Sequence, residues 1–292
     1  MWFWLSLTAI LFWSGSDLFS KIGSKPDDKY SHWKLVICVG VVMGIHGTFE
    51  IYTGTPFSLM DIIHYLPASL LYIFSMTIGY AGLRYIELSI SSPICNSSGA
   101  AAALLCFIFL DAHLTGLQFM AVSFVTIAVV ALAFIEKKKD AAFVEGPSQV
   151  KYERGVIAIL FPILYCILDG LGTFADAVIL ETMPEESANV AYEYTFLTMA
   201  VFAFIYLRFV KKQKFIVSKE KPKILAALCE TAGQFAYIFA IGANAVTAAP
   251  MISAYCIVSL MWSRLFLKER LSKGQYGVIA LAAAGIIILG ME

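Results

Sequence analysis

Runs of apolar residues, each about 20 residues long, recur along almost the whole chain. A helix that crosses the hydrocarbon core of a bilayer needs about 20 such residues, so runs of this length leave few alternatives for the fold. We expect ten membrane-spanning helices, at about residues 2–22, 34–53, 62–83, 88–109, 115–135, 155–179, 188–207, 223–242, 247–267 and 273–290. The sequence therefore predicts an all-α membrane protein.

The composition agrees with a bilayer environment. Hydrophobic residues make up 60% of the chain and charged residues only 14%, whereas a soluble protein carries about 25% charged residues. The formal net charge is zero, so we expect the lipid bilayer as the surroundings and no nucleic-acid partner. The start of the chain lacks a basic segment and a small-residue cleavage site, so we expect no signal peptide.

Neither a cofactor nor a metal ion is expected from the motifs. The six cysteines lie singly in apolar stretches, and no Cys-x-x-Cys pair or His-rich spacing accompanies them. The sequence contains no nucleotide-binding P-loop and no nucleophile–base pair. We therefore expect that the protein is not an enzyme. If its activity requires a driving force, we expect that force to be a gradient and not the hydrolysis of a nucleotide.

The basic residues gather on alternate connections between the predicted helices. Of the 21 Lys and Arg residues, 20 lie in or beside the odd-numbered loops, and the even-numbered loops have none. Cytoplasmic loops are the ones enriched in Lys and Arg. We expect the odd-numbered loops to face the cytoplasm and both termini to face outside, and the strict alternation supports ten helices. The remaining base, Arg264, lies near a helix end and can reach the interface.

Two stretches of the chain match one another without a gap when one is shifted by 157 positions. Tyr80 to Gln118 aligns with Tyr237 to Gln275, and the matched residues include Pro93 with Pro250 and Leu114 with Leu271. A constant offset of about half the chain predicts two copies of one unit. We expect a first five-helix repeat at 1–135, a cytoplasmic linker at 136–154 and a second five-helix repeat at 155–292.

The loop charges predict that the second copy is inverted. The second loop carries no basic residue, whereas its counterpart in the other copy, the seventh, carries seven. Corresponding loops would therefore lie on opposite sides of the membrane. This 5+5 inverted repeat is common among secondary transporters, whose substrate sites lie near the midplane between the repeats.

The end of the chain resembles a known family. The run Phe-Leu-Lys-Glu-Arg-Leu-Ser at residues 266–272, then Gln275 and a last helix rich in Gly and Ala, is similar to the drug/metabolite transporter superfamily, EamA branch. Trp-Ser-Gly-Ser at residues 13–16 is similar to that family's Trp-Gly-Ser segment, whereas Asp-Ala-His at 111–113 departs from its Lys-Glu-Arg triplet. The resemblance implies ten helices and secondary transport of small metabolites, often outward, by a monomer or homodimer in a bacterial cytoplasmic membrane.

Acidic residues outnumber basic ones inside the predicted helices. The acids are Asp17, Asp169, Asp176, Glu193 and Glu230, and the base is Arg264. We expect a transporter of an amino acid, an amine or a similar cationic or zwitterionic solute, working by alternating access, with proton coupling as an option. Two other interpretations stay open: a scaffold or receptor that does not transport, and a carrier of sugars or nucleobase-type solutes with the same fold.

Asp169 is the strongest candidate for binding the substrate and for coupling to protons. It lies about 14 residues into its predicted helix, and a charge at the bilayer centre costs about 2.5–3.5 kcal/mol, so such groups usually face a cavity or a partner. Tyr165, Thr173 and Asp176 share its helix face. The alternative is a protonated, hydrogen-bonded packing residue.

A second polar stripe is predicted in the eighth helix. Glu230, Gln234 and Tyr237 recur at i, i+4 and i+7, which places them on one face. Tyr80, the repeat counterpart of Tyr237, would supply a tyrosine at equivalent depth. We expect all four to bind substrate and Glu230 also to carry protons, while hydrogen bonding between helices is the alternative.

An acidic residue beside aromatic rings is expected near the outer end of the seventh helix. Glu193 precedes Tyr194, and an acid beside aromatics can hold an organic cation, although tyrosines also gather at membrane interfaces without a ligand. His46 is a candidate proton carrier because imidazole changes charge near neutral pH. An interior histidine with satisfied hydrogen bonds is the alternative.

Three further residues complete the expected substrate site. We expect Trp13, in the first predicted helix, to form part of the cavity wall. Asn96 and Tyr255 follow Pro93 and Pro250, and each proline either bends its helix into a gate or marks an ordinary helix start.

Two features receive less functional weight. Asp17 is four residues before Lys21, so an ordinary ion pair on one helix face accounts for it. Gly40 and Gly44 form a small-x-x-x-small pattern that predicts close helix packing, with no role in substrate binding.

Overall fold

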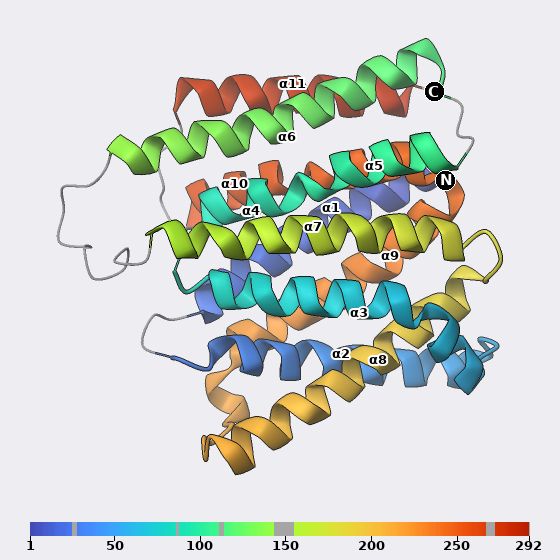
Figure 1. Ribbon diagram of the computed structural model, residues 1–292, viewed down its shortest axis with the longest axis vertical. Helices are drawn as coiled ribbons and strands as arrows, with labels where there is room; N and C mark the ends of the chain where they lie inside the picture. Colours follow the sequence, from blue (N-terminus) through green and yellow to red (C-terminus); the bar gives the residue numbers. More distant parts are fainter. Residues whose placement is uncertain (25–27, 86–87, 111–113, 143–154, 267–271, 292) are drawn as a thin grey trace.

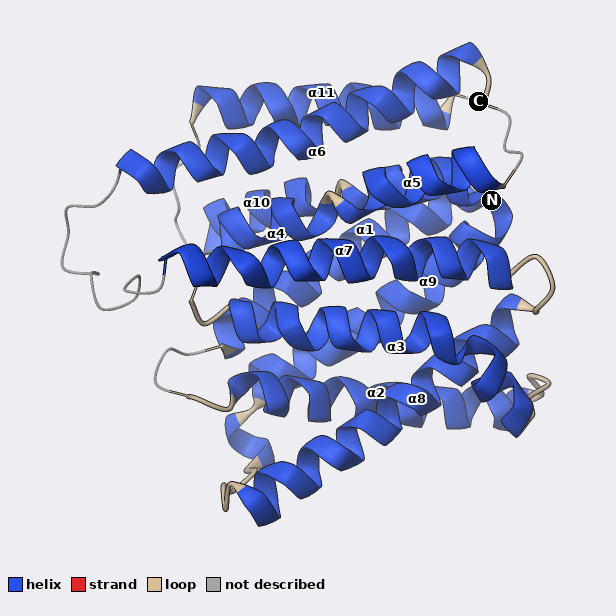
Figure 2. Ribbon diagram, in the orientation of Figure 1, coloured by secondary structure: helices blue, strands red, loops and turns tan. Residues whose placement is uncertain are grey.

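The part of the chain that the structure describes is helical throughout. The structure is a computed structural model, and it describes residues 1–24, 28–85, 88–110, 114–142, 155–266 and 272–291. No strand occurs within these ranges, and short connections join the helices (Figure 2). The predicted linker at 136–154 lies largely outside the described residues.

Figure 1 shows the helices stacked side by side along one direction. They are α1 (Trp2–Gly23), α2 (Ser31–Thr53), α3 (Leu59–Gly82), α4 (Leu88–Asn96), α5 (Ser98–Phe109), α6 (Gly116–Ala142), α7 (Gly155–Ile179), α8 (Glu185–Ile205), α9 (Lys221–Ser253), α10 (Tyr255–Phe266) and α11 (Lys273–Gly290). A π-helical turn (Tyr206–Val210) extends α8, and a 3-10 turn (Val217–Lys219) precedes α9.

Within the described residues, five helical stretches are long and apolar enough to cross a membrane. They are Ser31–Thr53, Leu59–Gly82, Leu160–Ile179, Glu185–Val210 and Lys221–Phe266, the last of which combines α9 and α10. Large apolar side chains are exposed on the outside of the molecule, including Phe49, Phe202 and Phe209 at 61%, 65% and 69%. Water-soluble surfaces keep such side chains few. The helices and the surface are compatible with a membrane protein.

The described connections separate by charge between the two ends of the molecule. Residues 54–58 and 180–184 lie at one end, together with the start of α1 and the end of α11 (Figure 1). Residues 83–85 and 211–216 lie at the other end. The first set contains no Lys or Arg, whereas the second contains four. We call these the non-basic end and the basic end.

A cluster of charged residues joins the starts of α2 and α9 at the basic end. Lys34 Nζ lies 2.8 Å from Asp28 Oδ2 and 3.4 Å from Glu220 Oε1, and Lys223 Nζ lies 2.5 Å from Glu220 Oε2. Partial burial acts to raise the pKa of Asp28, but the hydrogen bond and charge of Lys34 and the charge of Lys223 outweigh it and lower that pKa. The cluster ties the two helices together on this side.

The structure divides one predicted helix and agrees with one predicted break. The predicted helix at 88–109 is divided at Ser97 into α4 and α5. The predicted break between 242 and 247 coincides with a kink in α9 at Asn244, where φ is −166° and ψ is 81°, so the helix is interrupted there. The Asn244 side-chain oxygen accepts from the Thr247 N–H at 3.3 Å, which is an N-cap interaction for the helical segment that follows.

The interruptions at Ser97 and Ala254 are alike. They stand 157 positions apart, with φ −63° and ψ −12° at Ser97, and φ −66° and ψ −3° at Ala254. At each, the backbone N–H donates three residues back, at 3.3 Å to Ile94 and 3.1 Å to Met251. Both segments that match in sequence are therefore interrupted at the same position and in the same way.

Helix packing is unchanged when the two halves of the chain are exchanged. α1 packs on α9, and the corresponding pair, α7 and α3, also pack together. α2 packs on α8 and α6 on α11, and each of these two pairs joins helices that correspond to one another. α4 packs on α10, and the counterpart elements, the end of α9 and α5, also belong to helices that pack together. The helices of the two halves therefore pack mainly against each other, and the interior of the protein lies between the halves.

Two glycines allow the closest approach of α2 and α8. A Cβ at Gly40 would lie 2.4 Å from the Phe196 carbonyl oxygen, and one at Gly44 would lie 2.7 Å from Leu197 Cδ2. The predicted close packing at these positions is confirmed.

We expect Gly40→Val to destabilise the fold by about 1–3 kcal/mol, because the added atoms meet backbone that cannot move aside. Thermal unfolding in detergent measures this. Gly277→Ala is the matched control, since a Cβ there would meet nothing within 4 Å. An equal effect of both substitutions would contradict the tight contact.

Candidate functional site

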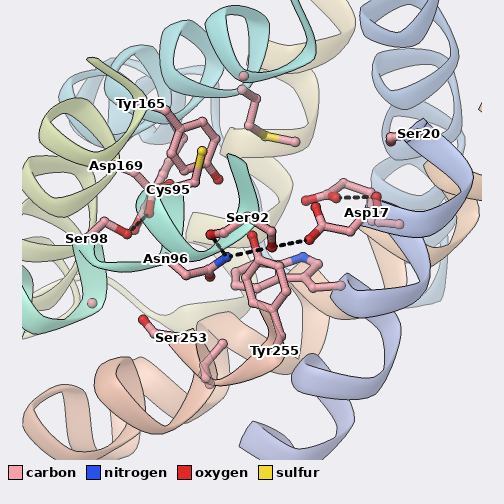
Figure 3. Close-up of a pocket in the computed structure, with 18 of the residues that line it drawn as sticks. Asp17, Ser20, Ser92, Cys95, Asn96, Ser98, Tyr165, Asp169, Ser253 and Tyr255 are labelled. Carbon is pink, nitrogen blue, oxygen red and sulfur yellow. Dashed lines mark hydrogen bonds between the residues drawn. The ribbon is translucent and has the colours of Figure 1, made fainter. Parts of the chain in front are cut away.

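A cavity lies where the helices of the two halves meet. Side chains from α1, α3, α4, α5, α7, α8, α9 and α10 line it, and its space, counted together with the open solvent at its mouth, is about 950 Å³. Figure 3 shows Asp169 and Asp17 on opposite sides of Ser92 and Asn96. None of the described residues that line the cavity is Lys, Arg or His.

Three carboxylates line this cavity, and each accepts from serine on another helix. Asp169 Oδ2 accepts from Ser98 at 2.6 Å, and Glu230 Oε2 accepts from Ser16 at 2.7 Å. Asp17 Oδ2 accepts from two serines, Ser92 at 2.6 Å and Ser259 at 2.8 Å. Hydrogen bonds fix the direction of each carboxylate but leave its charge unneutralised, so the cavity attracts cations.

Aromatic rings form much of the remaining wall. The aromatic residues are Trp13, Tyr72, Tyr80, Tyr165, Tyr192, Tyr237 and Tyr255. The Trp13 ring lies 4.9 Å from the Tyr237 ring and 5.7 Å from the Tyr255 ring, centroid to centroid. These faces, beside the three carboxylates, are suited to a cationic group.

The Trp13 ring is seated against the backbone of α9 at a glycine. A Cβ at Gly233 would lie 2.3 Å from Trp13 Cδ1, so any other residue displaces the ring. We expect Gly233→Ala to weaken ligand binding about 3–30-fold, the equivalent of one lost cation–π contact. Equilibrium binding to the purified protein measures this, with Gly277→Ala as the control. Unchanged affinity would show that Trp13 does not contact the ligand.

Three hydrogen-bond donors on the cavity wall have no acceptor within the described part of the chain. They are Trp13 Nε1, Tyr80 Oη and Gln234 Nε2, and all three atoms are buried. Buried donors in native proteins are almost always paired with protein, water or ligand. The cavity therefore offers donors to an acceptor group as well as carboxylates to a cation.

Hydroxyl groups and a fourth acid close the cavity toward the non-basic end. Asp176 is fully buried and accepts from Tyr65 and, at 2.8 Å, from Tyr72. Tyr72 Oη also lies 2.5 Å from Tyr237 Oη, and the two hydroxyl oxygens lie 3.1 and 3.3 Å from Thr173 Oγ1. This network joins α3, α7 and α9 at the end of the cavity that is nearer the non-basic end of the molecule.

Most of the residues predicted for the substrate site line this cavity. Those that do are Trp13, Tyr80, Asn96, Asp169, Glu230, Gln234, Tyr237 and Tyr255. Glu193, Tyr194 and His46 lie elsewhere: His46 Nδ1 is 2.8 Å from Glu193 Oε1, and Tyr194 Oη is 2.9 Å from Thr48 Oγ1. The structure thus brings together the two polar stripes and separates them from the outer cluster.

Comparisons with known proteins show a shared fold and identify no family. No protein-family model and no curated protein matches the chain. Among solved structures, 28 chains match. One of them, described only as the crystal structure of a protein, superposes with a TM-score of 0.67 at 15% identity, over 99% of this chain and 96% of its own. This similarity shows the fold alone.

The sequence alone did not reveal the full role of Asp17. That residue was assigned to an ordinary pair with Lys21, but its carboxylate lines the cavity and accepts from α4 and α10. Lys21 Nζ donates to the Leu83 carbonyl oxygen at 2.9 Å. The available sequence signal was the position of Asp17 one turn after Trp13, on the same helix face.

The four interior acids have apolar counterparts in the other half of the chain. At an offset of 157 positions, the matched pairs are Asp17 with Phe174, Asp169 with Phe12, Asp176 with Phe19, and Glu230 with Ile73. The packing of the halves is alike, but the chemistry at equivalent positions is not.

Proposed function

We propose that the chain is a secondary active transporter of a small cationic or zwitterionic metabolite, and that it belongs to the drug/metabolite transporter superfamily. The cavity carries this proposal. It has three carboxylates and seven aromatic residues, and no Lys, Arg or His among its described lining residues. Charge and cation–π attraction both make an ammonium group the ligand that such walls bind best.

The unpaired donors favour a ligand with a second polar end. Trp13 Nε1, Tyr80 Oη and Gln234 Nε2 need an acceptor, and the carboxylate or hydroxyl of an amino acid or amino alcohol supplies one. A simple alkylammonium ion would leave these donors to water. Amino acids and hydroxylated amines are therefore the first compounds to test.

Alternating access is the mechanism that the packing favours. Two five-helix halves would rock about the cavity and expose it to each side in turn. The exchange-symmetric helix contacts and the matching interruptions at Ser97 and Ala254 support a repeat of this kind. Both of these interruptions stand beside residues that line the cavity, Asn96 and Ser98 in the first half and Ser253 and Tyr255 in the second.

The conformation described here would be the one that faces the cytoplasm. The cavity wall extends to Ser20, Leu83 and Leu88, toward the basic end, and the Asp176 network closes the other end. Basic connections mark the cytoplasmic side. We propose a multi-pass protein of a bacterial cytoplasmic membrane with both termini outside.

Proton coupling through the cavity acids would follow from their position. A cation and a proton cannot both neutralise the same carboxylate, so binding of one would release the other. Asp169 and Glu230 are the acids we propose for this exchange. His46 lies apart from the cavity walls and would not compete with substrate directly.

Counterflow in proteoliposomes tests the proposed function. Vesicles loaded with one unlabelled compound at a time, from a panel of amino acids, amines, sugars and nucleobases, are presented with the labelled compound. We expect exchange of at least one amine or amino acid and slower exchange of neutral sugars. Exchange of sugars or nucleobases alone would replace the substrate class. Binding without exchange for every compound would favour a receptor.

Single cysteines in a cysteine-free background test the proposed orientation. We expect Ser148→Cys, in the linker between the halves, to react with an impermeant maleimide only after the cells are opened. Thr55→Cys, in the α2–α3 connection, should react in intact cells. The reverse pattern would invert the orientation, and labelling of both from one side would contradict an odd number of spans between them.

A further inference from the structure

A second polar cluster lies between α2 and α8, outside the cavity and unused by the proposed transport. Its members are His46 and Glu50 from α2, and Asn189 and Glu193 from α8. In Figure 1 these helices cross at the edge of the molecule farthest from α6 and α11. The cluster stands one to two turns from the non-basic end of each helix.

The potential ligand atoms of the cluster converge on one point. His46 Nδ1 lies 2.8 Å from Glu193 Oε1 and 3.6 Å from Glu50 Oε2, and the three ligand atoms all lie within 4.8 Å of one another. Atoms bound to one zinc ion, each about 2.0–2.2 Å from it, stand at similar mutual separations. Small shifts would place all three around a metal ion.

The charge of the cluster is incompletely balanced by the protein. Glu193 and Glu50 are 0% and 7% exposed, and two carboxylates this close repel each other in a medium of low dielectric constant. The sequence has no Lys or Arg between residues 35 and 83 or between 155 and 207. A protonated His46 would neutralise one carboxylate and leave the other, so the cluster attracts a cation.

Two buried oxygen atoms in the cluster have no hydrogen-bond partner within the described residues. They are Glu193 Oε2 and Asn189 Oδ1. Asn189 already donates through Nδ2 to Glu50 Oε2 at 2.8 Å, which leaves its amide oxygen as a further ligand. Buried oxygens without donors are rare, and a bound ion accounts for both.

A glycine makes room for the carboxylate of Glu193. A Cβ at Gly47 would lie 2.9 Å from Glu193 Oε2. The free oxygen therefore occupies space that any larger residue on α2 would fill. The space beside Gly47 lets the Glu193 carboxylate lie close to both His46 and Glu50.

We propose that His46, Glu50 and Glu193 form a binding site for a divalent transition-metal ion, with Zn²⁺ as the best fit and Asn189 or water as a further ligand. Imidazole favours zinc and its neighbours in the transition series over magnesium and calcium, which prefer oxygen ligands alone. The ligands come from helices 147 positions apart in the chain, so no sequence motif reveals them. The bound ion would clamp α2 to α8 near the non-basic end.

Isothermal titration of the full-length, untagged protein in detergent with Zn²⁺ tests this site. We expect one ion per chain, and binding of Mg²⁺ and Ca²⁺ at least about 10-fold weaker. His46→Ala and Glu193→Gln should each weaken Zn²⁺ binding by at least about 10-fold, as loss of a ligand does at metal sites. Glu181→Gln, an exposed acid just before α8, is the matched control and should bind like the wild type.

Three outcomes would overturn the site. They are the absence of saturable Zn²⁺ binding, equal Zn²⁺ affinity in the wild type and the ligand variants, and Mg²⁺ binding as tight as Zn²⁺. If Glu193→Gln does not fold, His46→Gln at the partly exposed member of the cluster serves in its place. X-ray absorption at the zinc edge should then show one nitrogen ligand fewer in that variant.

Discussion

Asp169→Asn is expected to lower exchange of the cationic substrate by about 10–100-fold. A hydrogen bond to a charged group contributes about 1.5–3 kcal/mol, and each 1.4 kcal/mol is a factor of ten in affinity. The amide keeps the shape of the carboxylate but lacks its charge. Binding and counterflow, measured on the same protein preparation, report the loss.

The fold should survive this substitution because the local hydrogen bond survives it. Ser98 donates to Asp169 Oδ2 at 2.6 Å, and the side-chain oxygen of asparagine accepts in the same way. Ser98→Ala is the control, since it removes the hydroxyl and keeps the charge, and we expect it to retain most of the exchange.

The result also separates substrate binding from proton coupling. If Asp169 binds substrate, exchange and binding fall together in Asp169→Asn. If it serves the proton alone, exchange persists and only accumulation driven by a pH gradient disappears. Unchanged exchange and unchanged accumulation would remove Asp169 from the mechanism.

Asp176→Ala is expected to open the cavity from the non-basic end. It leaves the hydroxyls of Tyr65 and Tyr72 without their acceptor, and an unsatisfied buried group costs about 1–3 kcal/mol. That energy shifts a two-state equilibrium by about 5–150-fold away from the closed arrangement.

Cys95 provides the measurement, because this buried cysteine lines the cavity. In the wild type, we expect an impermeant thiol reagent to modify it from the basic side alone. In Asp176→Ala, modification from the other side should rise at least about 10-fold. Peptide mass spectrometry distinguishes Cys95 from the other cysteines.

Tyr192→Phe is the matched control for this experiment. Tyr192 also lines the cavity, but its hydroxyl contacts Met76 Sδ at 3.2 Å and takes no part in the Asp176 network. The same gain of modification in both variants would mean that any loss of a cavity hydroxyl loosens the bundle, and the closure at Asp176 would not be specific.

Helical spacing predicted which residues of one helix share a face. Asp169 with Tyr165, and Glu230 with Gln234 and Tyr237, each occupy one helix face and line the same cavity. The side chains that share a helix face are determined by their spacing along the chain, so they can be read from the sequence. Charge inside an apolar run then indicated which face turns inward.

Contacts between helices could not be predicted in the same way. Ser16, Ser92 and Ser98 hold the acids, but nothing in the sequence distinguishes them from serines that bond to their own helix. Glu193 was expected to face a ligand between its neighbouring tyrosines, yet its direction depends on the rotation of α8 against α2. The two helices pack closely at Gly40 and Gly44, a contact between distant segments that helical spacing within α8 does not contain.

The helix interruptions show a similar limit. The proline positions predicted bends in the fourth and ninth helices, but the breaks stand four residues later, at Ser97 and Ala254. The bend at Asn244 depends on one side-chain hydrogen bond. Hydropathy placed a break between 242 and 247, where Asn244 stands, but it gives no signal at Ser97 or Ala254, which lie inside apolar runs.

The interior acids of each half have phenylalanine or isoleucine as their counterparts in the other half. This difference has a consequence for the kinetics of a carrier built from two such halves. Rocking the two halves would bring a different set of walls around the ligand, so its dissociation constants on the two sides of the membrane would be unequal. Detailed balance then requires the empty carrier to favour one orientation by the compensating factor. Such a protein would show different half-saturation concentrations from its two sides, while the gradients alone would set the direction of net flow.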